Sequence, residues 1–334
     1  MSTIKDLAKV TGFSANTVSN AIRNKSNVKR STKEVIQKAA HDLNYIPNAI
    51  ARSLISKKTF LIALVIHSIG DPFYTDLINY IEKFVYSSNY KLVLFNHNED
   101  IERQNIILKS IAEQDIDGVL INPALSDNSI IEKIISYNIP FVVLVRNCED
   151  HQVNFVGIDF KLSLKMVVEH FLKHGREKIL NICGSDITQS SIMRLSGYKQ
   201  ALNLHGIEFC PELVIENIKN KEHLWKQIDA LMKPIKKIDS IYCYDFFTTA
   251  EVLNYCKINK VNIPDDIAII GFEFDMFCEN AYIPVTAIKY DISGISKNAW
   301  FILENIINSK NSLNLVQSIY TKPELIIRKS CGEL

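Results

Sequence analysis

The side chains with the clearest chemical role lie in the stretch Ala15–Asn20, where short polar residues follow one another in a basic part of the chain. Residues 1–60 hold 11 Lys and Arg against 3 Asp and Glu, a formal charge of +8, whereas the remaining residues carry −7. A basic segment attracts polyanions, and short side chains without carboxylates suit a helix laid in the major groove of DNA. Chance clustering of surface lysines is the alternative. The pattern predicts a DNA-binding module joined to a larger acidic body.

Motifs that would assemble a catalytic or metal site are missing from the sequence. The chain has no GxGxxG, GxxxxGK[ST], HExxH or GxSxG pattern, and its eight histidines show no paired metal spacing. Its seven cysteines include no CxxC pair, and scattered thiols in odd number are typical of a reducing cytoplasm. His67 follows an apolar run and could be catalytic, but a polar residue at a pocket mouth is the commoner case. We therefore expect no enzyme activity, no cofactor and no metal site.

Three short helices are predicted to position the polar stretch. Thr3 and Ser14 are suitable helix N-caps, and Ser31 with Glu34 has the spacing of a capping box for the third helix. Each predicted helix carries apolar residues on one face.

A helix-turn-helix is predicted from the spacing of three residues. Ala8 allows close approach of two helices, Gly12 makes the turn with a positive φ, and Val18 packs the second helix on the first. A three-helix cap without a ligand is the alternative reading.

From Phe60 onward, short branched-apolar runs alternate with helical stretches, and the order repeats after His174. This alternation predicts parallel sheets in a doubly wound α/β fold. With 334 residues, 47% of them apolar, the chain can form a small head and two such units, and the segment after Val285 can cross back between them. The longest apolar run is too short to cross a bilayer, and MSTIKDLAKV lacks a signal-peptide core. A cytoplasmic protein is expected.

The head resembles the DNA-binding headpiece and hinge of the lactose-repressor (LacI/GalR) family. The resemblance rests on TIKDLAKVTGFSANTVSNAI and then NVKRSTKEVIQKAAHDLNYIPNAIARSL, with turn, caps and hinge in register. The family usually has Arg at the position of Asn20, so the operator half-site is expected to differ from the common one. The resemblance implies base reading by Ala15, Asn16 and Asn20, phosphate contacts by Thr17, Ser19 and Thr32, and minor-groove contacts by Ala51 and Leu54 of a hinge helix.

The body is similar to the same family through DPFYTDL, MRLSGY, PDDIAIIGFE and PELIIRKS. This resemblance implies a periplasmic-binding-protein-like body of two α/β subdomains, with a small ligand in the cleft at the carboxyl ends of the strands. The expected organisation is a headpiece at 1–46, a hinge helix and linker at 47–58, and an effector-binding and dimerisation domain at 59–334. One subdomain is expected at about 59–158 and 287–318, and the other at about 159–286 and 319–334.

The resemblance also implies the residues of the cleft. Arg194 matches an arginine that grips hydroxyls or a carboxylate, and its planar donors suit bidentate recognition. Phe73 matches an aromatic residue that often stacks on the ligand, although core packing is nearly as common. Asn122 and Ser190 match polar lining positions, with a helix-cap role as the alternative. The other expected cleft residues are Asp245, Phe246, Glu273 and Tyr290.

Several cleft positions depart from the family pattern. Val145 stands where an aspartate is frequent, although Arg146 fits; Asp245-Phe246 replaces an Asn-Asp pair, and Tyr290 replaces a glutamine. The cleft therefore loses polar partners and gains ring surface, which weakens the case for a neutral hexose. A sugar acid, a glycoside with an apolar aglycone or a nucleoside is expected instead.

These features predict a homodimeric transcriptional regulator, most often a repressor in this family, that binds a pseudo-palindromic operator in double-stranded DNA under the control of a small effector. A soluble sugar-binding receptor and a sugar-processing enzyme are the alternatives. The basic head argues against the first and the missing motifs against the second. No membrane is expected among its partners. Residues 48–54 are too few for a stable isolated helix, so the hinge is expected to fold only where two copies meet on the operator.

Overall fold

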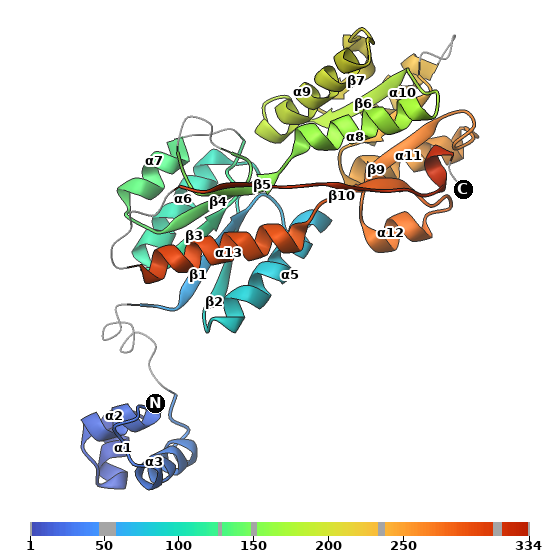
Figure 1. Cartoon of the computed structure of the whole chain (residues 1–334). Helices are drawn as coiled ribbons and strands as arrows, with labels where there is room; N and C mark the ends of the chain where they lie inside the picture. The colour runs from blue at the N-terminus through green and yellow to red at the C-terminus, as the bar shows by residue number, and fades with distance from the viewer. Residues whose placement is uncertain are drawn as a thin grey trace. The chain divides into compact units, whose positions relative to one another are not determined.

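The computed structural model describes residues 2–46, 58–125, 129–147, 152–232, 238–309 and 316–332. The chain forms two compact units, Met1–Thr59 and Phe60–Leu334, which we call the head and the body (Figure 1). No helix in the described ranges is both long enough and apolar enough to span a bilayer.

The head is a three-helix unit around a small apolar core. Its helices are α1 (Ile4–Thr11), α2 (Ala15–Ile22) and α3 (Arg30–Asp42). Each helix contributes its apolar face to the core, whose fully buried side chains are Leu7, Val18, Ala21 and Ile36. Because the core takes the apolar faces, the polar face of α2 is left to solvent.

Local capping fixes where the first two helices begin and end. Thr3 and Asp6 form a reciprocal capping box at the start of α1, and Gly12 ends that helix with a φ of 74°. At the start of α2 the Ser14 hydroxyl accepts from the Thr17 amide. The predicted caps of α1 and α2 are thus confirmed.

The predicted capping box of the third helix is wrong. Helix α3 begins at Arg30, and its N-cap Lys29 makes no side-chain cap hydrogen bond. Ser31 therefore lies inside the helix, two residues beyond the N-cap position from which a hydroxyl can cap. Glu34 instead forms an ion pair with Arg30 at 3.1 Å.

The body contains two six-stranded sheets, each covered by helices on both faces (Figure 1). In the first sheet the order is β11-β5-β4-β3-β1-β2 and every neighbouring pair is parallel. Its strands are β1 (Leu61–Ile66), β2 (Lys91–Asn96), β3 (Gly118–Ile121), β4 (Phe141–Val145), β5 (Phe155–Ile158) and β11 (Ser318–Thr321). Its helices are α5 (Pro72–Ser87), α6 (Ile101–Glu113), α7 (Ser129–Ser136) and α13 (Ile292–Asn308).

The second sheet has the order β12-β10-β9-β8-β6-β7, with only the β10–β12 pair antiparallel among its described strands. Its strands are β6 (Ile179–Gly184), β7 (Val214–Glu216), β8 (Ser240–Cys243), β9 (Ala268–Phe272), β10 (Thr286–Lys289) and β12 (Glu324–Ile326). The surrounding helices are α8 (Phe160–Lys173), α9 (Gln189–Leu204), α10 (Lys221–Met232), α11 (Phe246–Ile258) and α12 (Asp275–Asn280), with short 3-10 helices at Pro211–Leu213 and Lys329–Cys331.

Alternate side chains of each strand enter different cores. In β1, Ile62 and Leu64 pack with Leu77 of α5 and with α13, whereas Ala63 and Val65 pack with α6 and α7. Strands buried on both faces read as continuous apolar runs, which is the pattern that identified them. The predicted doubly wound fold is confirmed.

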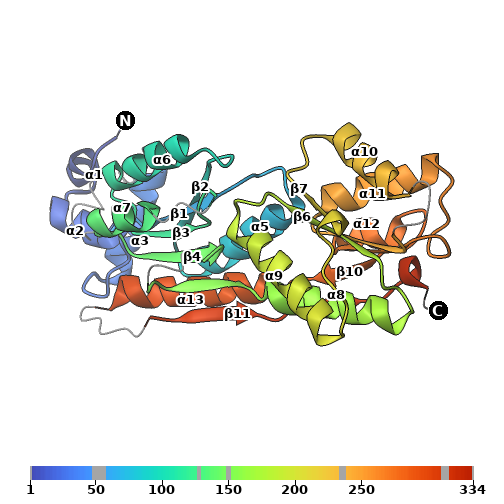
Figure 2. The same ribbon diagram turned by 90° about the horizontal axis from the view of Figure 1, so that it is seen from above.

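Three segments of chain connect the subdomains, and two of them lie later than expected. The predicted bounds put residues 287–318 in the first subdomain and 319–334 in the second. The structure has β10 (Thr286–Lys289) in the second sheet and β11 (Ser318–Thr321) in the first. Helix α13 lies between these strands in sequence and packs on the first sheet beside α5 (Figure 2). The apolar pattern runs on through each crossing, so it does not mark where a strand changes sheet.

Candidate nucleic-acid interface and ligand cleft

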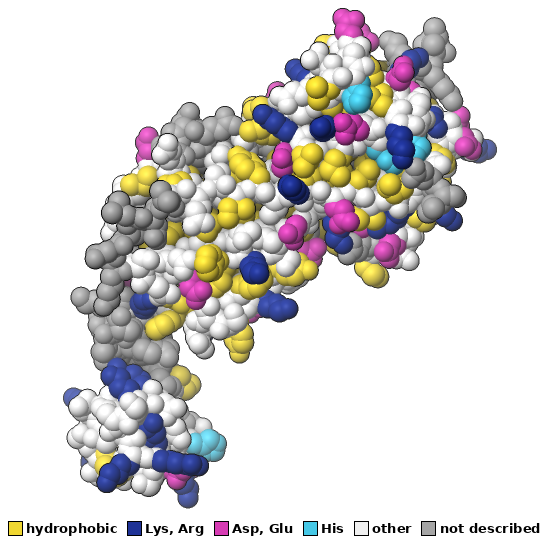
Figure 3. Space-filling model, viewed as in Figure 1, with side chains coloured by type: hydrophobic (Ala, Val, Ile, Leu, Met, Phe, Trp, Pro, Cys, Tyr) yellow, Lys and Arg dark blue, Asp and Glu magenta, His cyan; other side chains and the backbone are white. Residues whose placement is uncertain are grey.

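Helix α2 presents the polar surface of the head. Its buried residues are Val18 and Ala21, while Ala15 and Asn16 are exposed and Asn20 is half-buried on the helix surface. Figure 3 shows Lys and Arg side chains spread over the visible face of the head. Short side chains on a cationic surface fit base reading in a major groove.

The residues expected to contact phosphates differ in their hydrogen-bond partners and in their exposure to solvent. The Thr17 hydroxyl lies 2.9 Å from that of Ser14, and Thr32 is half-buried in the first turn of α3. Arg23, which the sequence reasoning missed, donates from Nη2 to the Ser19 hydroxyl and from Nε to the Ser19 carbonyl at 3.2 Å. Arg23 therefore brings a guanidinium to the place where a Ser19 contact was expected.

The hinge residues Ala51 and Leu54 lie outside the described residues, as does most of the expected hinge at 47–58. Their expected role in the minor groove stays a prediction.

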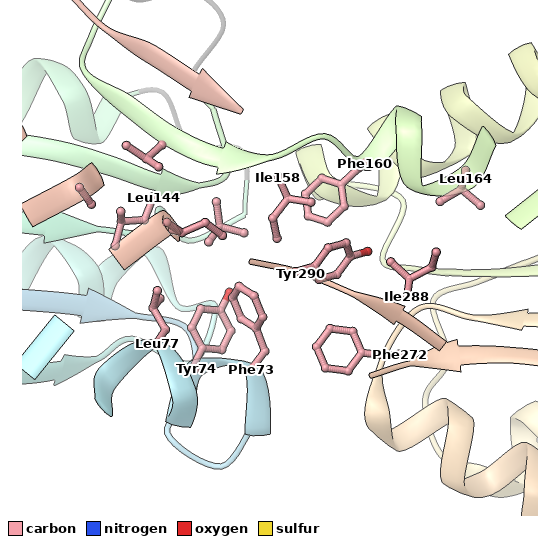
Figure 4. Packing of buried hydrophobic residues seen from close by; sticks show 14 of the residues in the cluster. Phe73, Tyr74, Leu77, Leu144, Ile158, Phe160, Leu164, Phe272, Ile288 and Tyr290 are labelled. Atoms are coloured by element: carbon pink, nitrogen blue, oxygen red, sulfur yellow. The ribbon is translucent and has the colours of Figure 1, made fainter. Parts of the chain in front are cut away.

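A cavity of about 380 Å³ lies between the two subdomains of the body. Its walls come from the carboxyl ends of strands in both sheets and from the starts of the following helices, which is where doubly wound sheets bind ligands. In Figure 4, Phe73 and Tyr74 at the start of α5 lie opposite Phe272 at the end of β9 and Tyr290 just after β10, with Phe160 nearby. We call this cavity the ligand cleft.

Arg194, in α9, contributes a positive charge to the cleft wall formed by the second subdomain. Its guanidinium lies 4.4 Å from the Phe160 ring centroid and 5.3 Å from that of Tyr244. The residue is 8% exposed, and its Nε makes no hydrogen bond with any described residue. Burial would lower the pKa of Arg194, but the oxygens of Tyr290, Tyr242 and Tyr244 raise it. The side chain is a charged, pre-positioned donor with unused capacity.

Hydroxyl groups at the start of α9 lie beside this arginine. Ser190 is buried and lines the cleft, as expected. Thr188 and Ser191 also line it, but the Thr188 hydroxyl donates to the Ser185 carbonyl at 3.0 Å and that of Ser191 to the Cys183 carbonyl at 2.7 Å. Local bonds thus hold the turn that presents Ser190.

Asp71 is the acidic residue of the opposite wall and was not among the expected cleft residues. It caps α5, because Oδ1 accepts from the Phe73 amide at 2.9 Å. Burial and the negative charge of Asp245 raise the pKa of Asp71 to about 6, against the opposing effects of that hydrogen bond, Arg194 and Arg146. The motif DPFYTDL contained the signal, since an aspartate directly before a helix at a strand end faces the cleft.

Glu99 and Arg146 form a partly buried ion pair in the same wall. The guanidinium donates to both carboxylate oxygens, at 2.7 and 2.9 Å, and Glu99 also accepts from the Leu125 amide at 2.7 Å. Burial alone would raise the pKa of Glu99, but Arg146 lowers it. His67 Nδ1 lies 3.1 Å from this carboxylate, and burial lowers the pKa of His67. Glu99 was missed because it pairs across 47 residues of sequence.

Val145 holds an unusual backbone conformation at the edge of the cleft. Its φ is 64°, and the Arg146 amide donates to the Leu144 carbonyl at 2.6 Å, which makes a three-residue turn. A β-branched residue at positive φ is strained. Val145 occupies the position where the family often has an aspartate. The turn at Val145 directs the side chain of Arg146 to Glu99.

Asp245 and Tyr290 line the cleft as expected. Asp245 caps α11, with Oδ1 accepting from the Thr248 amide at 2.8 Å and from its hydroxyl at 2.6 Å. The Tyr290 ring centroid lies 5.6 Å from that of Phe272 and 5.8 Å from that of Phe160. Phe73 also lines the cleft, but it packs on Tyr74 as well, so its two expected roles coincide.

Asn122 is not a lining residue of the cleft, which corrects the expectation. It is fully buried behind the wall at the end of β3. Its side-chain amide donates to the Tyr74 hydroxyl, and its carbonyl accepts from His97 Nε2 at 2.9 Å. Asn122 therefore supports Tyr74, whose ring does line the cleft.

Phe246 is also outside the cleft lining. As the first residue of α11 it turns its ring onto Phe274 and Phe277, at centroid distances of 5.4 and 4.8 Å. Its neighbour Tyr244 lines the cleft in its place.

Glu273 has a structural partner in place of a ligand. Arg328 donates to its two carboxylate oxygens at 2.7 Å each, and the Glu273 side chain is only 3% exposed. Glu273 lines a different cavity, of about 460 Å³, and not the ligand cleft. Arg328, in the motif PELIIRKS, is the missed partner, and nothing in local sequence spacing indicates a pair 55 residues apart.

Within the described ranges, no group of three or more His, Cys, Asp or Glu side chains could hold a metal ion. The head and cleft define a DNA-binding protein with a two-subdomain ligand-binding body.

Comparison with known proteins gives the same division. Residues 3–48 match the family of bacterial regulatory proteins called lacI, and residues 168–331 match a periplasmic binding protein-like domain. The chain is 27% identical over 335 residues to the HTH-type transcriptional repressor PurR of Photobacterium profundum, covering all of both chains.

Solved structures show the same fold. A lac repressor dimer bound to operator and the anti-inducer ONPF has a TM-score of 0.87 at 20% identity, covering 99% of each chain. A complex of the regulator CelR with cellobiose has a TM-score of 0.74 at 20% identity, covering 99% of this chain and all of that one.

The chain belongs to the LacI family of bacterial regulatory proteins. The expectation of a DNA-binding transcriptional regulator, and not an enzyme, is confirmed by this membership.

Proposed function

We propose that the chain represses transcription by binding operator DNA as a homodimer and that a small molecule in the ligand cleft sets its operator affinity. The observation that carries this proposal is the pairing of a cationic helix-turn-helix head with a cavity walled by both subdomains. The relative in Photobacterium profundum is named a repressor, and one structural neighbour is a repressor dimer on its operator. Its place of action is then the cytoplasm, where the operator lies.

Each segment expected from the sequence has a separate function in this proposal. Residues 1–46 bind the operator half-site, 47–58 form the hinge, and the body binds the effector and the second copy. Ala15, Asn16 and Asn20 read bases, Thr17, Ser19 and Thr32 contact phosphates with Arg23 beside them, and Ala51 and Leu54 enter the minor groove. In the cleft the effector contacts Arg194, Ser190, Asp245, Tyr290 and Phe73.

A ligand that contacts both walls changes the opening of the cleft. Its free energy of binding therefore favours one arrangement of the subdomains over another. In a dimer such a change alters the spacing of the paired hinges and so the operator affinity.

The test is a gel shift of the full-length protein on its own promoter. Specific binding to a pseudo-palindromic site is expected, weakening as salt rises with a log–log slope of about −0.9 per neutralised phosphate. Each half-site with its partner half scrambled serves as the control. Full affinity of a monomer for an asymmetric site would contradict the proposal.

A further inference from the structure

Two carboxylates face the ligand cleft from opposite subdomains. Asp71 caps α5 of the first subdomain, and Asp245 caps α11 of the second. In each residue Oδ1 serves the cap, at 2.9 Å from the Phe73 amide and 2.8 Å from the Thr248 amide. Neither carboxylate forms an ion pair with a described residue, so both charges are available to a ligand.

The charges lining the cleft do not balance. Glu99 is neutralised by the bidentate guanidinium of Arg146. This leaves Asp71 and Asp245 against Arg194, which stacks on the rings of Phe160 and Tyr244 and contacts neither carboxylate. Partly buried charges whose neighbouring cations offset them only in part are unfavourable, and the repulsion between Asp245 and Asp71 contributes to the raised pKa of Asp71. A ligand that brings one positive charge relieves this imbalance.

A second observation indicates what else the ligand carries. Arg194 is more than nine-tenths buried, lines the cleft, and has an Nε without a hydrogen-bond partner among the described residues. A guanidinium donates and never accepts, so an oxygen is the kind of ligand atom that Arg194 can hold. Aromatic rings occupy much of the remaining wall and favour a compact, partly apolar body.

We propose that the effector is a small amine whose protonated nitrogen lies between Asp71 and Asp245 while an oxygen of the same molecule accepts from Arg194. The cavity of about 380 Å³ is near the lower end of small-molecule sites, so the effector has one ring or little more. Amino sugars and arylalkylamines share this chemistry. The inference rests on the proposed function, because it names the ligand class of the same cleft.

The arrangement also links the amine to the conformation of the body. Asp71 and Asp245 belong to different subdomains, and an ammonium group attracts both. In the free protein, the repulsion between the two carboxylates opposes the approach of the subdomains. When the ammonium group lies between them, its attraction to both carboxylates favours that approach. A neutral hydroxyl group in the place of the ammonium group can donate a hydrogen bond, but it does not offset the repulsion between Asp71 and Asp245.

The test compares each amine with the neutral molecule closest to it in shape. Isothermal titration of the full-length protein at pH 7.5 uses glucosamine against glucose and N-acetylglucosamine, galactosamine against galactose, and tyramine against tyrosol. At least one amine is expected to bind tenfold or more tightly than its neutral counterparts. The comparisons with glucosamine and galactosamine test amino sugars, and the comparison with tyramine tests arylalkylamines.

Asp71→Asn and Asp245→Asn test the two carboxylates separately. Asparagine is as good an N-cap as aspartate, so the helices keep their starts while one charge is lost. Each variant is expected to reduce the amine preference to under threefold. The matched control is Asp100→Asn, which removes the charged N-cap of α6 at a residue that does not line the cleft and is expected to leave the preference unchanged.

The affinity for the amine is also expected to fall as pH drops from 7.5 to 5, because Asp71 takes up a proton in the free protein. The other charged groups around it are Asp245, Arg194, Arg146, Glu99 and His67, and burial lowers the pKa of His67 against the opposing effect of Glu99. The neutral counterpart should show little change.

Three results would overturn the inference: no amine bound more tightly than its neutral counterpart, a panel in which nothing binds, or a preference that survives both asparagine variants. Thermal unfolding checks that each variant is folded, and the wild-type comparison stands without them. A neutral ligand that alters operator affinity would overturn the inference that the effector is an amine, but it would support the proposed function. Absence of specific operator binding would overturn the proposed function.

Discussion

Arg194 combines stacking with an Nε that has no hydrogen-bond partner among the described residues. The rings of Phe160 and Tyr244 hold its plane, and no described carboxylate takes its charge. A pre-positioned guanidinium needs little reorganisation when a ligand arrives, so most of its hydrogen-bond energy is available for recognition.

We predict that Arg194→Ala abolishes the response to effector while the affinity for operator without effector is kept. The arginine lies in the body, whereas the operator contacts lie in the head. Arg194→Lys should also lose most of the response, because an ammonium group cannot donate in a fork. Gel shifts with and without effector measure both quantities. An undiminished response in Arg194→Ala would exclude this residue from the site.

Glu273 and Arg328 show how an expected ligand contact can be a structural pair. Arg328→Met leaves the Glu273 carboxylate buried without its counter-charge, so a loss of about 3–5 kcal/mol in the free energy of unfolding is expected. The double variant Glu273→Leu with Arg328→Met should recover most of that loss. Urea unfolding of the wild type, Arg328→Met, Glu273→Leu and the double variant provides the measurement. A loss below 1 kcal/mol would mean that solvent replaces the pair.

Asp71 predicts a specific pH dependence of stability. Its pKa of about 6 in the folded protein is above the ordinary value of 3.8, so the folded state holds the proton more tightly than the unfolded state. The resulting stabilisation is full below about pH 4 and is lost as pH rises through 6. Asp71→Asn removes this loss, so its stability relative to wild type should rise from pH 4 to pH 7. Urea midpoints at several pH values test this, and a constant difference would contradict it.

Helix α2 is a rigid carrier for the base-reading residues. Ser14 fixes its start and Val18 its rotation, so Asn16 and Asn20 keep a constant spacing. Specificity can then change through one side chain without changing the element that presents it.

We predict that Asn20→Arg changes the preferred half-site. Asparagine pairs best with adenine, whereas arginine pairs best with guanine, and a good pair discriminates by about 1–3 kcal/mol. Binding to a library of randomised half-sites measures the preference. Lys38→Arg, on a helix other than α2, provides a charge-conserving control elsewhere on the head. An identical preferred sequence in Asn20→Arg would place this residue outside the base-reading surface.

Elements defined by local chemistry could be predicted from sequence. The caps at Thr3 and Ser14 and the strand at Leu61–Ile66 depend on neighbours a few residues away, so their residue types indicate the structure. Asp245 could be placed at the cleft because it follows a strand.

Pairings between distant segments could not be predicted in this way. Arg146 with Glu99 and Arg328 with Glu273 join residues that only the folded chain brings together. Phe246 was misplaced for a related reason: one residue of rotation at a helix start decides whether a ring faces the cleft or the neighbouring helix, here α12. Sequence pattern gives the element but not that rotation.

At the scale of the whole body, the cleft lies where the chain passes between sheets. Tyr290 follows β10 directly at such a crossing, and its ring contacts Phe272 of the second sheet while lining the cleft. Asp71 and Asp245 lie at helix starts on the two sides. A ligand in the cleft therefore touches groups whose separation depends on the relative position of the subdomains, which is the requirement for coupling a small molecule to a distant site.

The last prediction is that effector and operator change each other's affinity by the same factor. Thermodynamic linkage requires this equality whichever direction the effect takes, and a coupling free energy of about 1–3 kcal/mol corresponds to about a 5–150-fold change. The operator dissociation constant is measured with and without saturating effector, and the effector dissociation constant with and without operator DNA. Two equal factors above fivefold are expected for the wild type, whereas Arg194→Ala should give a factor of one, and so should an operator with both half-sites scrambled. Unequal factors would show that effector or DNA also changes the assembly of the subunits, and a factor of one in the wild type would mean that the cleft does not control the head.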